Sequence, residues 1–241
     1  MSHFHHWVTL HRVRFAEPVS ALERVFKAPT GPDCWRFCPS QNLGENDLPT
    51  LSSDVWCGFA IHNDRDQAQA MFDAPDQALP FGDEVVESWH ALALPVQHRG
   101  EVNWRGTLES NAALAPNAED GGGPLAVMTT AGFNDPANPD ELPRIKRFAL
   151  KVGEAIEFLG QQPGNLRTDV FNGGFDGKGG FTLTLWKSDD AMLKAAYHSG
   201  HHRMLMDESR DGSLFDFSSF SRLRILDSKG AWEGDPLAEV A

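Results

Sequence analysis

The sequence predicts an α+β protein made of two consecutive units, each with the element order β-α-β-β-α-β. Three observations lead to this prediction. Strand-type segments recur in the same order in both halves, the junctions between strands and helices match, and a stretch rich in Ala, Gly and Pro separates the halves. The element order is that of the ferredoxin-like arrangement. We therefore expect tandem ferredoxin-like repeats, with antiparallel sheets packed on each other and helices outside.

Alternating apolar residues and β-branched or aromatic runs predict four strands in each half. In the first half the strands are expected at WVTLHRVRF (7–15), CWRFCPS (34–40), VWCGFAIHN (55–63) and SWHALALPV (88–96). In the second half they are expected at LAVMTTAGF (125–133), LRTDVFN (166–172), GFTLTLWKS (180–188) and FSRLRILDS (220–228). Helical patterns fall at 17–27, 64–73, 140–159 and 189–208.

The junctions between strand and helix support a duplication. VWCGFAIHNDRDQAQAMF places a strand directly before a helix with Asn63 or Asp64 as N-cap, and GFTLTLWKSDDAMLKAAY repeats this pattern at Asp189. The last strand of each half ends in a basic-Gly turn followed by a tryptophan, Trp104 or Trp232. Agreement in both order and junction chemistry is harder to reach by chance than agreement in order alone.

The domain boundaries follow from the composition. AALAPNAEDGGGP (112–124) is typical of a linker. We therefore expect an N-terminal repeat at 1–111 and a C-terminal repeat at 125–241. A ligand cavity is expected between a sheet and its helices or between the two sheets.

Composition excludes several classes of function. The 241 residues are 41% hydrophobic and 23% charged, which is enough for a packed core. The net charge of −13 argues against nucleic acid and anionic membranes as partners. No run of 18 apolar residues and no signal-type segment occur, so we expect a cytoplasmic protein with no membrane span. The three cysteines are expected to be free thiols.

The segment KAAYHSGHHRMLMDE (194–208) contains three of the ten histidines. On a helix, one stripe collects His202 with small residues and methionines, whereas His198 and His201 lie on another stripe with a lysine. The members of the first stripe are Met192, Ala195, Ser199, His202 and Met206. Small residues beside a histidine leave room for a flat coordinated group, although a histidine on an apolar helix face is also typical of a hydrogen-bonded core residue. Spacing alone leaves both interpretations open.

Several segments resemble the spheroidene monooxygenase family of carotenoid oxygenases. They are CWRFCPSQNLGENDLPTLSSDVWCGFAI (34–61), ESWHALALPVQHRGEVNWRG (87–106), GPLAVMTTA (123–131) and FTLTLWKSDDAMLKAAYHSGHHRML (181–205). The resemblance implies a haem-dependent enzyme, with haem b (iron), on a scaffold of the dimeric α/β-barrel type. The histidine of the family's Gly-x-His element falls on His202, and its strand-end tryptophan falls on Trp186.

These expectations define a candidate haem site in the C-terminal repeat. The resemblance implies that His202 is the metal ligand, with Ser199 and Met206 beside it on the helical stripe. Trp186 and Phe181 are expected to line the cofactor pocket. The first repeat has no histidine at the position equivalent to His202, so we expect one haem per chain. No catalytic side chain is predicted.

The expected function is therefore a haem-dependent monooxygenase that inserts oxygen into a small apolar substrate, with an electron donor as partner. One alternative is a haem enzyme of the dehydratase type, acting on an N–O bond. Another is a cofactor-free small-molecule binding module, and a cofactor-free oxygenase ranks below both. The chain is expected to be a monomer or a homodimer.

Overall fold

The computed structural model describes most of the chain. The described residues are 6–24, 26–32, 34–43, 48–79, 81, 84–100, 123–174, 178–198 and 214–237. Within them no helix is long and apolar enough to cross a membrane. The three cysteines are free and buried, as predicted from their number and spacing.

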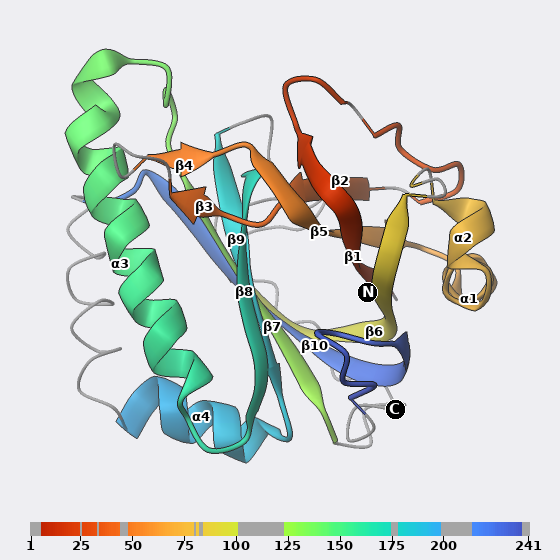
Figure 1. Ribbon diagram of the computed structural model, residues 1–241. Coiled ribbons are helices and arrows are strands. Elements are labelled where there is room, and N and C mark those ends of the chain that lie inside the picture. The colour runs from red at the N-terminus through yellow and green to blue at the C-terminus, as the bar shows by residue number, and fades with distance from the viewer. Residues whose placement is uncertain are drawn as a thin grey trace.

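The long strands and the helices α1, α3 and α4 follow the predicted order (Figure 1), whereas the described residues of 17–27 form no helix and the short elements β3, β4 and α2 were not predicted. The first half contains β1 (Trp7–Ser20), β2 (Cys34–Pro39), β3 (Asn42–Leu43), β4 (Pro49–Thr50), β5 (Ser52–His62), α1 (Arg65–Asp73), α2 (Pro75–Ala78) and β6 (Val85–Gly100). The second half contains β7 (Leu125–Gly132), the 3-10 turn η1 (Pro139–Glu141), α3 (Leu142–Gly160), β8 (Asn165–Gly174), β9 (Gly179–Trp186), α4 (Asp189–His198) and β10 (Phe217–Gly230).

One eight-stranded antiparallel sheet joins the two halves. Its strand order is β2-β5-β1-β6-β10-β7-β9-β8. Read from the centre outwards, each half places its fourth main strand first, then its first, third and second. This shared order confirms the tandem ferredoxin-like α+β fold. The two halves meet where β6 pairs with β10.

The helix predicted at 17–27 is wrong. β1 continues to Ser20 and is followed by a turn at 21–23. The pairing of β1 with β5 shifts register between Arg14 and Val19, so a bulge bends the strand and lets it pair again. Pro18 lies inside this unpaired stretch, where its missing N–H interrupts no ladder bond. Residues 17–20 therefore belong to a bent strand, and the helical spacing of the sequence does not correspond to a helix here.

The sheet curls until its two edge strands approach each other. Ser40, just after β2, forms an antiparallel bridge with Phe171 of β8. The N–H of Gln41 donates to the carbonyl of Val170 at 2.7 Å. The Ser40 hydroxyl donates to Asp169 Oδ1 at 2.9 Å. These bonds close the sheet into a barrel, so the two predicted sheets are the two sides of one continuous surface.

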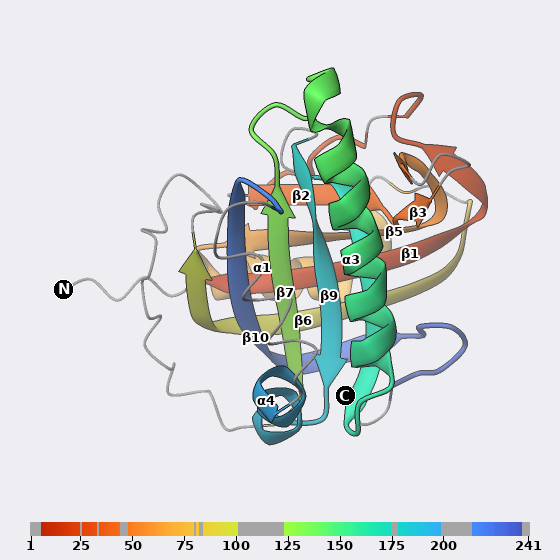
Figure 2. The same cartoon turned by 90° about the vertical axis from the view of Figure 1, so that its left-hand side faces the viewer.

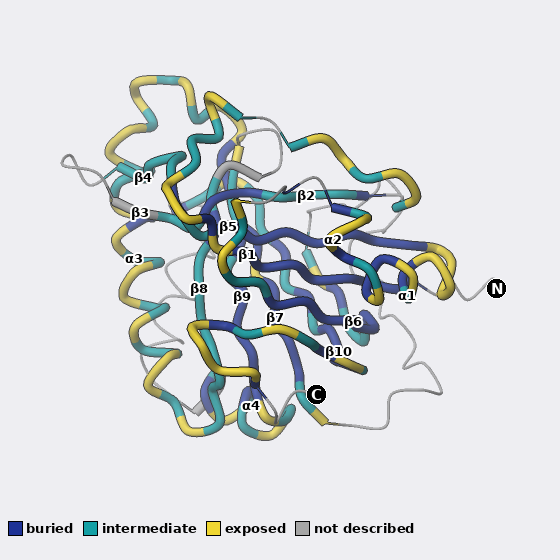
Figure 3. The backbone as a smooth tube through the Cα atoms, turned by 45° about the vertical axis from the view of Figure 1, so that its right-hand side comes forward, coloured by how far each residue is buried: buried dark blue, intermediate teal, exposed yellow. Residues whose placement is uncertain are grey.

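The barrel interior is the main core. Alternate residues of every long strand belong to one buried cluster. Figure 3 shows the buried residues of the central strands in dark blue. The cluster includes Leu10 of β1, Phe59 of β5, Phe181 of β9 and Leu223 of β10, all with 2% exposure or less. The halves thus share one core, and the repeat boundaries at 111 and 125 stay a prediction. Of the linker predicted at 112–124, only the last two residues are described.

The helices cover opposite outer sides of the barrel. α1 and α2 pack on the first half, and α3 and α4 on the second, so a layer of helices flanks each side (Figures 1 and 2). The N-cap of α1 is Asp64, whose carboxylate accepts the N–H of Gln67 at 2.9 Å, as the sequence predicted. The predicted helix at 140–159 is confirmed as η1 and α3.

Candidate functional site

The two outer sides of the barrel are built differently. We call the outer surface of β7, β9 and β10 the second outer face. Residues paired across strands share a side of the sheet, which defines its members. They are Leu125, Val127, Thr129, Thr182, Thr184, Trp186, Phe220, Arg222 and Arg224. This face carries the part of the predicted haem site that the structure describes.

Helix α4 seals one end of the second outer face. Met192 and Ala195 are buried against Leu125, Val127 and Trp186. Both belong to the helical stripe that contains His202, so the described part of that stripe faces the sheet. The Trp186 indole N–H donates to Thr184 Oγ1 at 2.7 Å, which fixes the ring under α4.

A buried arginine anchors the N-terminus of α4. Arg224, which is 4% exposed, contacts the Asp189 carboxylate through its Nη2 and donates from Nη1 to the carbonyl of Gly123 at 2.6 Å. Asp189 also lies 4.0 Å from Arg222. Because the carboxylate sits in the first turn of α4, these contacts hold the helix in register with β10.

Helix α3 covers the second outer face incompletely (Figure 2). Near its start Phe148 contacts Phe133 and Phe215, with ring centroids 5.6 and 5.7 Å apart. At its far end Leu159 packs against the cluster around Trp186. Between these anchors Thr129 of β7 remains exposed. Among the described residues, the floor is thus apolar around Val127 and Trp186 and exposes Thr129 at its centre.

The structure places the predicted site residues in three groups. Ser199, His202 and Met206 lie outside the described residues. Trp186 lies on the second outer face, and Phe181 points to the other side of β9, into the barrel, where it contacts Phe59 and Phe171. The structure therefore does not bring Trp186 and Phe181 to the same side of the sheet.

The outer side of the first half contains a row of buried polar residues that the sequence analysis did not select. Its members are Thr9 and His11 of β1, His62 of β5 and His90 of β6, which we call the histidine row. All four are 3% exposed or less. His11 Nδ1 lies 3.0 Å from His90 Nδ1, and His11 Nε2 lies 2.8 Å from Thr9 Oγ1. The signal available in the sequence was a histidine at the centre of two apolar alternating strands.

Burial keeps the central histidines of the row neutral. Burial is the largest cause that holds the pKa of His11 well below its ordinary value, with further lowering from His90, His62 and Lys229. Burial and then Lys229 lower the pKa of His90 to about 4, against a smaller opposing effect of Asp76. Both rings are therefore uncharged at neutral pH.

The neutral rings restrict where the hydrogens lie. Two arrangements satisfy these contacts: the Thr9 hydroxyl donates to Met71 Sδ at 3.4 Å and accepts from His11 Nε2–H, or it donates to His11 Nε2 and every role in the row is reversed. In the first arrangement, a neutral His11 protonated at Nε2 has a bare Nδ1, which must accept from His90 Nδ1–H. His90 Nε2 is then an unprotonated acceptor. This nitrogen is buried and has no hydrogen-bond partner in the structure.

Two adjoining cavities lie beside His90, between α2 and the start of β6. Their volumes are about 380 and 460 Å³. They share Asp76, Ser88 and His90, so we treat them as one cleft, the α2 cleft. Its polar end carries Gln77 and Lys229. Its other end, which we call the apolar end, is lined by Val13, Leu79, Phe81, Val85 and Val86, together with Glu87.

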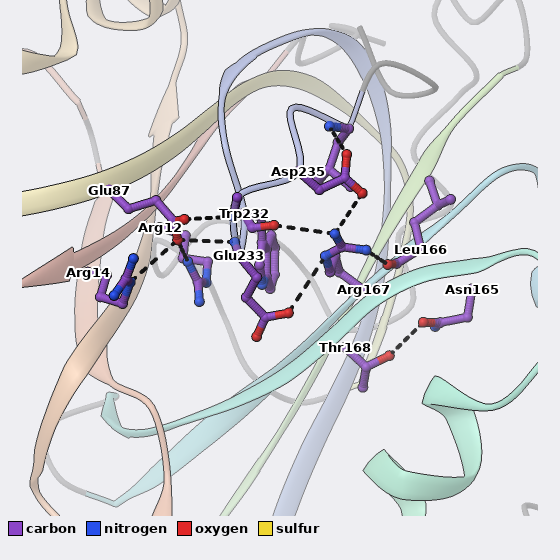
Figure 4. A network of polar contacts seen from close by, with 12 residues as sticks. Arg12, Arg14, Glu87, Asn165, Leu166, Arg167, Thr168, Trp232, Glu233 and Asp235 are labelled. Atoms are coloured by element: carbon purple, nitrogen blue, oxygen red, sulfur yellow. Dashed lines mark hydrogen bonds and ion pairs between the residues drawn. The ribbon is translucent and has the colours of Figure 1, made fainter.

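A network of charged residues fixes the residues after β10 at one end of the barrel (Figure 4). Arg12 donates to Glu87 at 3.0 Å and lies 4.8 Å from the Trp232 ring centroid. Burial alone would raise the pKa of Glu87, but the N–H groups of Gly234 and Glu233 and the Arg12 guanidinium hold it below its ordinary value. Glu87 is paired with Arg12 and accepts the N–H groups of Glu233 and Gly234. We therefore assign the network a structural role.

Arg167 of β8 holds the same residues after β10 from the second half of the barrel. Its guanidinium donates to Asp235 at 2.7 Å and to the Trp232 carbonyl at 3.3 Å (Figure 4). Together with Arg12, it holds the residues after β10 across both halves of the barrel. Among the described residues no three His, Cys, Asp or Glu side chains are grouped to hold a metal ion.

Comparison with known proteins places the fold. No protein-family model and no curated protein match the sequence, so the spheroidene monooxygenase family is not identified at the sequence level. The structure of aldoxime dehydratase OxdRE in complex with butyraldoxime aligns with 94% of this chain and 81% of its own, with 11% identity and a TM-score of 0.59. Another aldoxime dehydratase aligns with 94% of this chain and 83% of its own, with 10% identity and a TM-score of 0.59.

These likenesses show a shared fold. At 10% and 11% identity they do not transfer an activity to this chain. The chain is an α+β barrel of the dimeric α/β-barrel kind, in which both ferredoxin-like units belong to one polypeptide. Its two outer sides, the second outer face and the side with the histidine row, are the two candidate functional sites.

Proposed function

We propose that the chain is a haem-dependent enzyme that holds haem b on the second outer face, between the sheet and helices α3 and α4. The observation that carries the proposal is the floor around the exposed Thr129, whose apolar part is formed by Val127, Trp186 and Phe220. A flat apolar cofactor needs such a floor, and a sealed core would have no room for one. The fold shared with two aldoxime dehydratases over 94% of the chain is consistent with a site of this kind.

His202 is the proposed metal ligand. It follows Met192 and Ala195 on a helical stripe, and both of these residues are buried against the second outer face. Ser199 and Met206 lie on the same stripe in the sequence. Trp186 forms the floor under α4, and Phe181 supports this floor from the interior side of β9. The Arg224–Asp189 contact positions the helix that precedes His202.

When bound, a histidine-ligated haem would supply an open sixth position for redox or Lewis-acid chemistry. The residues of the chain would supply the surroundings. Val127, Trp186 and Met192 exclude water from one side of the site, which strengthens polar interactions inside it. The apolar floor favours an apolar substrate.

Two reactions fit this site. The first is dehydration of an aldoxime, in which the C–H and N–O bonds break and a nitrile and water form with no net electron transfer. Both aligned structures at a TM-score of 0.59 favour it, since both proteins are aldoxime dehydratases. The second is oxygen insertion into an apolar substrate, which requires O₂ and an electron donor. The resemblance of several segments to spheroidene monooxygenases favours the second.

Haem titration tests the cofactor. Adding haemin to the purified protein is expected to give a Soret band that saturates at one haem per chain, and His202→Ala is expected to abolish it. His201→Ala is the matched control, because it removes the neighbouring histidine and leaves His202 in place. An unchanged spectrum in His202→Ala would exclude His202 as the ligand. A protein that stays colourless with excess haemin would exclude the proposal.

Product analysis separates the two reactions. Haem-loaded protein is incubated anaerobically with butyraldoxime under reducing conditions, and butyronitrile is measured by gas chromatography. Nitrile formation without O₂ identifies the dehydratase. Oxygen uptake that depends on an apolar substrate and a reductant, with no nitrile formed, identifies the oxygenase. The His202→Ala variant serves as the blank in both assays.

A further inference from the structure

The α2 cleft lies on the opposite side of the barrel from the second outer face, and the proposed function does not use it. It reaches the histidine row at His90, which is 3% exposed. His90 and Ser88 lie on β6, and Asp76 lies on α2, so a strand and a helix both contribute to the walls. The cleft is large enough for a molecule of about ten non-hydrogen atoms at ordinary packing density.

The two nitrogens of His90 are in different situations. Nδ1 is fixed by His11, at 3.0 Å, and His11 is fixed in turn by Thr9. Nε2 is buried and has no partner. A buried polar atom without a hydrogen bond is costly, and native structures rarely leave one without a reason. The row therefore orients the ring and presents one unsatisfied atom beside a cleft.

The chemistry of the missing partner follows from the hydrogen assignment. In the arrangement in which Thr9 donates to Met71, His90 Nε2 is the bare nitrogen, and its partner is an O–H or N–H donor. Charge at this position is disfavoured, because burial is the main cause of the lowered pKa of His90 and would penalise a charged ligand in the same way. The apolar end, at Val13, Leu79 and Phe81, suits an apolar body attached to the donor group.

We propose that the α2 cleft is a binding site for a small uncharged molecule that carries a hydroxyl or N–H donor on an apolar body. The donor group hydrogen-bonds to His90 Nε2, and the apolar body lies against Val13, Leu79 and Phe81. Ser88, at the junction of the two cavities, is in place to contact the same polar group. This site is independent of haem, and it belongs to the first half of the chain.

Histidine side-chain ¹⁵N NMR tests the proposal on the haem-free protein. Benzyl alcohol is the probe, and benzyl methyl ether, which has the same ring and no donor, is its matched control. Benzyl alcohol is expected to move the His90 Nε2 resonance in a saturable way towards the protonated type. It is expected to bind at least about tenfold more tightly than the ether. The resonance is assigned by its loss in His90→Phe.

A second pair of variants keeps the test independent of the folding of His90→Phe. Gln77 is an exposed residue of α2 that lines the cleft, and Gln67 is an exposed residue of α1 that does not. Gln77→Trp is expected to weaken benzyl alcohol binding at least tenfold, and Gln67→Trp to leave it unchanged. His202→Ala is expected to bind the alcohol like the parent protein, so loss of the haem proposal would leave this result intact.

Three results would overturn the proposal. They are equal affinity for the alcohol and the ether, the absence of a saturable shift, and a His90 Nε2 resonance that is already of the protonated type in the ligand-free protein.

Discussion

The two halves of the barrel share one strand order but differ on their outer sides. In the first half, four polar side chains, three of them histidines, lie buried under α1 and α2. In the second half the corresponding surface mixes apolar residues with threonines and arginines, contains the buried Trp186–Thr184 bond and the buried Arg224, and exposes Thr129. Strand order thus fixes where a surface lies, and the alternating side chains of a few strands decide its chemistry.

The largest expected effect comes from breaking the histidine row. His11→Phe would leave His90 and Thr9 without their buried partner, so we expect a loss of about 3 kcal/mol in the free energy of unfolding. Urea denaturation with an unchanged m-value measures it. The matched change on the second outer face is Thr184→Val, which removes one acceptor from Trp186 and is expected to cost about 1 kcal/mol. Equal losses would contradict the contrast between the halves.

The next effect is a pH dependence that the first half should confer. His11 and His90 have folded-state pKa values below the unfolded value, with His90 at about 4, so the unfolded chain binds protons first as the pH falls. Stability from these two groups is fully present above about pH 7 and is lost as the pH falls from about 6.5 towards 4. Between pH 7.5 and 5.5 we expect a loss of about 2–3 kcal/mol.

Chemical denaturation at the two pH values measures this loss. The variant His11→Phe/His90→Phe should show a flatter profile over the same range, because it lacks both groups. A parent protein with equal stability at pH 7.5 and 5.5 would contradict the buried neutral state of the row.

The smallest effect on stability is expected on the open floor. Thr129→Trp places a large ring at an exposed position and should change the free energy of unfolding by less than about 0.5 kcal/mol. The same ring should block the proposed haem site, so haemin uptake is expected to fall at least tenfold. Leu22→Trp, at a residue 82% exposed in the turn after β1, is the control and should bind haemin normally. Normal uptake by Thr129→Trp would exclude this floor as the haem site.

Most of the fold could be predicted from local patterns. Period-two alternation located the eight long strands, and the side-chain chemistry of Asp64 located the start of α1. The helix expected at 17–27 is wrong because β1 continues through a β-bulge and Pro18 to Ser20, where a turn follows. The closure of the barrel at Ser40 and Phe171 joins residues 131 positions apart (171 − 40), and no local pattern encodes such a contact.

The candidate sites were less predictable for the same reason. His11 and His90 are 79 positions apart in the chain, and only the register of β1 and β6 brings them together. By contrast, the separation of Phe181 and Trp186 could have been read from the sequence. They are five positions apart on one strand (186 − 181), an odd spacing, so they point to opposite sides of the sheet. The prediction that Phe181 and Trp186 line one pocket used only their aromatic character and not the alternation of side chains along the strand.

The continuous sheet across β6 and β10 has an evolutionary consequence. Where two identical subunits pair to build such a barrel, every substitution appears on both sides at once, and symmetry forces the two surfaces to share their chemistry. Here each side is encoded by its own stretch of polypeptide. Mutations can therefore introduce histidines on one outer side while the other side keeps its apolar residues. The two sides can then evolve separate functions without a further duplication of the fold.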